Sequence, residues 1–158
     1  MTEKEMASAE NIFEIARRKA GGLDWERFAI FYGRIALGAA FLSGIASRFG
    51  MYPAGLGYGN FANFVKYTAE VNAFMPAVTI PFLAWGATAA ELFFGVALIL
   101  GLWTRWVAWG SAFLLLVFGL AMAISFGIKS PLDYSVFSAS AAAVFLAVTE
   151  TGRATRKA

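Results

Sequence analysis

The sequence predicts an all-α integral membrane protein, a four-helix bundle with one amphipathic helix on its amino-terminal side and another in its outer connection. Hydrophobic residues make up 59% of the 158 residues and charged residues only 15%, whereas soluble domains average about 25% charged residues. The apolar residues gather in four segments, each close to the roughly 20 residues that a helix needs to cross a bilayer. Little chain remains outside these segments, so we expect a single four-helix domain at residues 28–149.

Residues 1–27 are polar and are predicted to form a cytoplasmic amphipathic segment that lies on the membrane surface. Apolar residues recur there at roughly helical spacing, together with a basic cluster and two glycines: Ile12, Phe13, Ile15, Ala16 and Ala20; Arg17, Arg18 and Lys19; Gly21 and Gly22. The glycines predict the end of this helix, and Trp25 is predicted to lie at the edge of the membrane.

The first predicted span covers residues 28–45. Ala36, Ala40 and Gly44 follow one another at four-residue intervals, a spacing that predicts close packing of this face against another helix. Arg34 lies about two turns inside the segment. It is the candidate partner for an acidic residue in the next span.

The second predicted span, residues 82–103, is the segment around which the others are arranged. It contains one carboxylate, Glu91, near its middle. At helical spacing, this residue shares a face with small side chains: Ala84, Ala87, Thr88 and Gly95. A carboxylate at the centre of a bilayer costs a few kcal/mol even on insertion scales. We therefore expect Glu91 to face protein, water or a cation, and its small-residue face to pack against other helices.

The third and fourth predicted spans cover residues 106–126 and 132–149, and a basic tail follows at residues 150–158. Because basic segments tend to remain in the cytoplasm, the distribution of Lys and Arg outside the spans predicts that both termini are cytoplasmic. We expect a multi-pass protein of the cell inner (plasma) membrane. The predicted inner side carries Lys4, Arg17, Arg18, Lys19, Arg27, Arg105, Arg153, Arg156 and Lys157, and the predicted outer side carries Arg48, Lys66 and Lys129.

The long connection between the first two spans is predicted to lie on the outer face. This connection could be a lid over a cavity, with three aromatic side chains lining a channel for an apolar tail. It could also be a hydrophobic plug without a ligand, which is the simpler interpretation. Both interpretations depend on an amphipathic helix, which is predicted by apolar residues at helical spacing: Phe61, Phe64, Tyr67, Val71 and Phe74. The three candidates for the channel are Phe61, Phe64 and Tyr67.

Arg34 and Glu91 are the candidate functional residues. Paired with each other, they would lock the first span against the second. Alternatively, they would form a polar pocket with Thr88, where a quinone headgroup, an anionic substrate or a proton is handled. Glu91 would then be the residue that exchanges protons.

Composition excludes several chemistries. The chain has no cysteine and no histidine, so it lacks the usual ligands of zinc sites, the cysteines of iron–sulfur clusters and the histidine ligands of haem. We expect no metal and no intrinsic cofactor. The net charge of +3 arises from basic residues at membrane boundaries and not from a basic face, so we expect no nucleic-acid partner.

Two motifs resemble those of the DoxX family of small four-helix membrane proteins. One is an arginine followed by small residues, GRIALG at 33–38 and FLSG at 41–44, and the other is ELFFGVALILGLWTR at 91–105. The resemblance extends over residues 28–149. It implies a multi-pass protein of a kind often found as a small subunit beside soluble redox partners. The name-giving members are associated with thiosulfate oxidation coupled to quinone reduction.

We therefore expect an accessory subunit that anchors or couples a redox partner in a membrane-bound assembly, in contact with the lipid bilayer and with other membrane or peripheral subunits. The alternative from the enzyme class is a quinone-reactive oxidoreductase subunit of the thiosulfate:quinone type, with the quinone near Arg34 and Glu91. A third alternative is a small transporter or lipid-handling protein.

Overall fold

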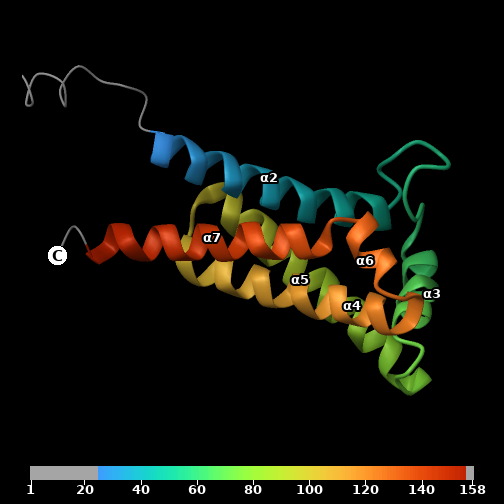
Figure 1. Ribbon diagram of the computed structural model, residues 1–158. Helices are drawn as coiled ribbons and strands as arrows, with labels where there is room; N and C mark the ends of the chain where they lie inside the picture. The colour runs from blue at the N-terminus through green and yellow to red at the C-terminus, as the bar shows by residue number, and fades with distance from the viewer. Residues whose placement is uncertain (1–24, 156–158) are drawn as a thin grey trace, which may run out of the picture.

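The computed structural model describes residues 25–155, whose regular structure is entirely helical (Figure 1). Most of the predicted amino-terminal amphipathic segment, residues 1–24, lies outside the described residues, as do residues 156–158 of the basic tail. The elements are α2 (Trp25–Arg48), α3 (Phe61–Val71), the 3₁₀ helix η1 (Ala77–Thr79), α4 (Ile80–Leu100), α5 (Thr104–Phe126), α6 (Lys129–Asp133) and α7 (Val136–Thr155).

The four long helices α2, α4, α5 and α7 run alternately up and down the molecule (Figure 1). The amino end of α2 and the carboxyl end of α7 lie at one end of the bundle. The connection 49–60, α3 and α6 lie at the opposite end, which we call the cap end. Neighbouring helices pair antiparallel, with α2 against α4 and α5 against α7, as in an up-and-down four-helix bundle.

Three stretches of helix are long and apolar enough to cross a membrane: Trp25–Arg48, Ala77–Leu100 and Thr104–Phe126. In α7 the apolar stretch is shorter and covers Val136–Glu150. The structure therefore supports a membrane protein with a helical bundle, and the fourth crossing stays a prediction. Bulky apolar side chains cover the outside of the spans, as lipid contact requires, and include Phe82, Phe93, Phe113, Leu120 and Ile124.

The second span ends earlier than the prediction of residue 103, because glycine stops the helix. Gly101 has φ +73°, a left-handed conformation that glycine adopts at little cost. Its N–H donates to the Leu98 carbonyl at 3.2 Å, and the N–H of Leu102 donates to the Ala97 carbonyl at 2.9 Å. These two bonds form a Schellman motif, which satisfies the last carbonyls of α4 and turns the chain into α5.

The fourth helix begins later than predicted, because the chain breaks at Ser135, which has φ +55°. The residues predicted to begin the span instead form the separate five-residue helix α6 (Lys129–Asp133). Within α6, the Lys129 ammonium and the Asp133 carboxylate form an exposed ion pair at 2.5 Å. The long helix α7 then starts at Val136.

Helices α2 and α4 approach each other closely at two glycines and not at the predicted alanines. A Cβ atom on Gly38 would lie 2.9 Å from the carbonyl oxygen of Gly95, and one on Gly95 would lie 2.9 Å from the Leu42 side chain. Ala36 and Ala40 are exposed, so the prediction that they pack against another helix is wrong. The two glycines therefore set the spacing of this helix pair.

The predicted small face of α4 is packed as expected. Ala84 is fully buried, Thr88 and Gly95 are buried, and Ala87 is half-buried. Gly44, the third member of the predicted seam on α2, lies against the Glu91 carboxylate. These contacts place the carboxylate inside the bundle.

Candidate functional site

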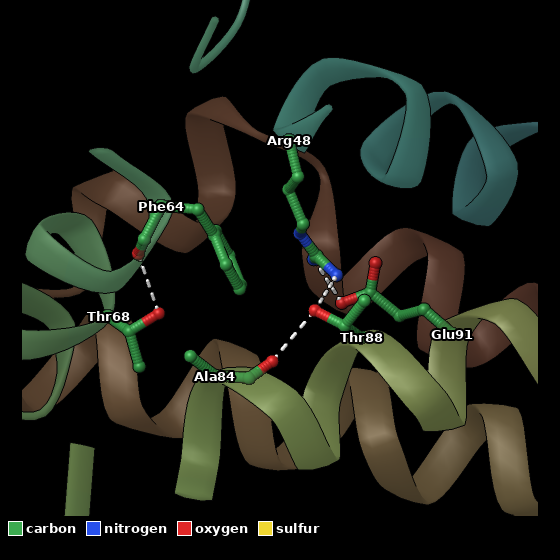
Figure 2. Close-up of polar contacts among 6 residues, drawn as sticks. All are labelled: Arg48, Phe64, Thr68, Ala84, Thr88 and Glu91. Carbon is green, nitrogen blue, oxygen red and sulfur yellow. Dashed lines mark hydrogen bonds and ion pairs between the residues drawn. The ribbon is translucent and has the colours of Figure 1, made fainter. Parts of the chain in front are cut away.

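A buried ion pair joins α2 to α4 just inside the cap end of the bundle. Arg48 is the last residue of α2 and Glu91 lies near the middle of α4. The Arg48 Nη2 atom donates to Glu91 Oε1 at 2.6 Å, and each residue is 4% exposed (Figure 2). The expectation that Glu91 faces protein and a cation is confirmed.

Two further side chains complete the surroundings of Arg48. Its Nη1 atom donates to Thr88 Oγ1 at 3.0 Å, and the Thr88 hydroxyl donates to the Ala84 carbonyl at 2.7 Å (Figure 2). The Phe64 ring from α3 lies 3.8 Å from Arg48 Cζ, a cation–π distance. The Arg48 Nε atom is buried and has no hydrogen-bond acceptor among the residues that the structure describes. The guanidinium is thus held by a carboxylate, a hydroxyl and an aromatic face.

Helix α3 is held over this pair by contacts with α5 and α4. The Asn60 side chain accepts from the Asn63 N–H at 2.9 Å and caps the first turn. At the other end, the Ser125 hydroxyl of α5 donates to the Val71 carbonyl at 2.6 Å. In between, the Phe61 ring packs against Trp85 of α4 with centroids 4.3 Å apart. These contacts fix α3 as a cover over the ion pair.

The connection before α3 brings a tyrosine close to the pair. The Tyr58 N–H donates to Ser47 Oγ at 2.9 Å, and the Gly59 N–H donates to the Ser47 carbonyl at 3.2 Å. The Tyr58 ring contacts the rings of Phe64 and Tyr67 at centroid distances of 5.2 and 5.3 Å. Burial raises the pKa of Tyr58 well above its ordinary value and also raises that of Tyr67. Both phenols therefore stay neutral near pH 7.

Glu91 also lines a cavity of about 180 Å³, whose lining does not include Arg48. Glu91 is the one lining residue with a polar side chain, and its Oε2 atom accepts no hydrogen bond from any residue that the structure describes. The Oε2 atom lies against Gly44, where a Cβ atom would be 3.0 Å away. Residues from α2, α4, α5 and α7 form the wall: Leu37, Ala40, Phe41, Glu91, Leu115, Phe118 and Ala139.

Arg34 is not the partner of Glu91, so the predicted pairing of these two residues is wrong. The Arg34 Nε atom donates to the Leu98 carbonyl at 2.9 Å, and Nη2 donates to the Ile99 carbonyl at 3.1 Å. The physical reason is the antiparallel register: Arg34 is nearer the amino end of α2 and is therefore level with the carboxyl end of α4. Its cation donates to two of the last carbonyls at the negative end of that helix, and the Leu98 carbonyl also accepts from the Gly101 N–H.

The structure brings together three of the predicted pocket residues: Glu91, Thr88 and Phe64. Phe61 and Tyr67 lie beside them on α3, in the ring contacts already described, and Arg34 lies elsewhere. Sequence reasoning missed Arg48, because ending the first span at residue 45 placed this arginine in the outer connection. The signal that could have found it is the continuation of the helical pattern by one turn beyond Gly44. Within residues 25–155 there is no group of three or more acidic side chains that could hold a metal ion.

A family model described as DoxX matches residues 29–124, which is more than half of the chain. The matched region contains most of α2, all of α3 and α4 and nearly all of α5, and therefore both members of the ion pair. No curated protein and no solved structure matches the chain.

Proposed function

This chain belongs to the DoxX family, and on that premise we propose that it is a small non-catalytic subunit of a membrane-bound assembly, which anchors or couples a redox partner. In this proposal it is a multi-pass protein of the inner membrane, and its partners are other membrane or peripheral subunits. Three helices of spanning length and an exposed apolar surface support the membrane setting.

The observation that carries the proposal is that the polar groups inside the bundle serve to join helices. Arg48 and Glu91 link α2 to α4, and Ser140 on α7 donates to the Ala112 carbonyl of α5 at 2.8 Å. Ser111 donates to a carbonyl of its own helix. A buried pair of opposite charges fixes how its helices register. Such an interior favours a structural role over a reaction centre.

The proposed orientation has both termini in the cytoplasm. The start of α2 and the end of α7 lie at the same end of the bundle (Figure 1). At that end the chain turns from α4 into α5, and the first turn of α5 carries Arg105 between Trp103 and Trp106, whose side chains are exposed. Exposed tryptophans beside an arginine favour a membrane–water boundary. A peripheral redox partner would meet the protein on this basic side.

Matched neutralising substitutions test the subunit role. Glu91→Gln keeps the shape of the side chain and removes its charge, which leaves Arg48 buried without a counterion. We expect the assembly to accumulate poorly in Glu91→Gln membranes, whereas Asp133→Asn, which breaks the exposed pair with Lys129, leaves it unchanged. Normal accumulation of the Glu91→Gln assembly together with slow turnover would contradict a non-catalytic role.

That contrary result would support the second candidate, a quinone-linked oxidoreductase subunit. The observation favouring it is that one carboxylate oxygen of Glu91 has no donor from the described residues and stands beside a cavity. In this candidate Glu91 would exchange a proton with a quinone bound there. Extraction of the purified assembly with organic solvent should then yield a quinone in a fixed ratio to the chain, and a quinone-free preparation with full activity would exclude it.

A further inference from the structure

The cavity beside Glu91 opens sideways, at membrane depth. Ala40 lines the cavity and is also exposed on the outside of α2, so the mouth lies at this residue. Ala40 is eight residues from the end of α2 at Arg48, or about 12 Å at 1.5 Å per residue, and lies still farther from the other end. Since α2 has the length and composition of a membrane span, the mouth faces acyl chains and not water.

Small side chains on both sides keep this mouth open. On α2 the exposed residues around Ala40 are Ala36, Ala39 and Ser43, and on α7 the exposed residues beside the lining Ala139 are Ser138, Ala141 and Ala142. Elsewhere the spans present bulky side chains to lipid, such as Phe82 and Phe113. Alanine and serine side chains are too short to fill the space between α2 and α7. The cavity therefore stays accessible from the bilayer.

The size and the wall of the cavity define what it can hold. A cavity of about 150 Å³ accommodates a benzene ring, and this cavity measures about 180 Å³. Phe41 and Phe118 supply aromatic wall. A single six-membered ring with one small substituent fits this space, and a fused ring system with a long rigid body does not.

The charge of the wall defines the polar group of the ligand. Arg48 already neutralises Glu91 through Oε1, so a second cation is not needed, and an anion would be repelled by the carboxylate. The remaining oxygen, Oε2, is an acceptor that the described residues leave without a donor. A neutral hydroxyl group can donate a hydrogen bond to Glu91 Oε2 at a smaller desolvation cost than a charged donor.

We propose that the cavity bounded by Leu37, Phe41, Leu115, Phe118 and Glu91 binds a neutral, lipid-soluble ring compound with a hydroxyl group, which enters from the bilayer past Ala40 and donates to Glu91. This is the cavity in which the second candidate function places a quinone, and Arg48, Thr88 and the side chains of α3 do not line it. The inference concerns binding alone and does not require the subunit role, so either can fail without the other.

Fluorine NMR of the purified full-length chain in detergent tests this site with two matched probes. 4-Fluorophenol carries the hydroxyl, and 4-fluorotoluene replaces it with a methyl group of similar size. Dissociation constants are expressed in terms of the mole fraction of each probe in the micelle, because the two compounds partition differently between water and detergent. A hydrogen bond to a charged acceptor should favour 4-fluorophenol by about tenfold to a hundredfold.

Substitutions at the mouth locate the binding. Ala40→Phe places a ring across the opening and is expected to lower the affinity for 4-fluorophenol at least tenfold, as is Ala139→Phe. Ala89→Phe is the matched control, since Ala89 is exposed on α4 and does not line the cavity. Circular dichroism and the unfolding midpoint verify that each variant is folded. Equal affinity for the two probes, no binding of 4-fluorophenol, or full binding by folded Ala40→Phe would each overturn the inference.

Discussion

Removing one member of the Arg48–Glu91 pair should destabilise the bundle far more than removing both. Arg48→Met leaves the Glu91 carboxylate buried without its partner at 2.6 Å, and also removes the contacts with Thr88 and Phe64. Breaking a buried pair in this way costs about 3–5 kcal/mol, whereas apolar residues in place of both charges are often neutral or stabilising. We therefore expect a coupling energy of at least about 3 kcal/mol between Arg48→Met and Glu91→Leu.

The assay is reversible unfolding of the purified chain by SDS in mixed micelles, followed by circular dichroism. A parallel cycle with Arg34→Met serves as the control. Arg34 bonds to the Leu98 carbonyl, seven residues beyond Glu91 and about 10 Å along α4, so its coupling with Glu91 should stay within about 0.5 kcal/mol. A large coupling to Arg34 and a small one to Arg48 would refute the pairing that the structure gives.

Three further changes test separate parts of the structure. Gly119→Ala places a Cβ atom 2.6 Å from the Phe137 ring and should lower the free energy of unfolding by about 1–3 kcal/mol in the same titration. Adding Phe137→Leu should recover part of that loss. No recovery would mean that α5 and α7 do not meet at these two residues. Gly101→Ala forces a left-handed conformation on alanine and places a Cβ atom against the Arg34 guanidinium, so it should cost more than the roughly 1–2 kcal/mol of backbone strain alone, and Gly101→Asn should cost at least as much; a loss below about 1 kcal/mol would contradict this turn. Burial raises the pKa of Tyr58, so the stability that the neutral Tyr58 phenol contributes is complete below the ordinary tyrosine pKa of about 10 and disappears as the pH rises above that value. Tyr58→Phe should therefore lose less stability than the wild type between about pH 9 and pH 12. An equal loss of stability in both proteins at alkaline pH would contradict the burial of this phenol.

The features that could be predicted from the sequence are those set by local pattern. Apolar length alone located α2, α4 and α5, because a span must be long enough to cross the bilayer. The aromatic stripe from Phe61 predicted a helix in the outer connection, and α3 is there. The burial of Glu91 followed from the cost of exposing a carboxylate to lipid, and the residue is 4% exposed.

The partner of Glu91 could not be predicted, because it depends on the register between two helices that are far apart in the sequence. That register is set where Gly38 meets Gly95, a contact that no local pattern specifies. One extra turn at the end of α2 then carries Arg48 into the bundle. Ending the predicted helix three residues too early was enough to make Arg34, and not Arg48, the predicted partner of Glu91.

The break between α6 and α7 could not be predicted from the sequence for a different reason. Pro131 resembles the first residue of a long helix, and proline is common at that position. The chain instead breaks four residues later, at Ser135, which adopts φ +55°. Positive φ is infrequent for residues other than glycine, so serine at this position gives no signal of a break.

Solid-state NMR of the protein in lipid bilayers tests the central pairing most directly. Arginine is labelled with ¹⁵N at its Nη atoms and glutamate with ¹³C at its carboxyl carbon, and the signal that is absent from Glu91→Gln is assigned to Glu91. Our account predicts strong ¹⁵N dephasing of that signal, retained in Arg34→Lys and lost in Arg48→Lys. Dephasing that is lost in Arg34→Lys and retained in Arg48→Lys would contradict it.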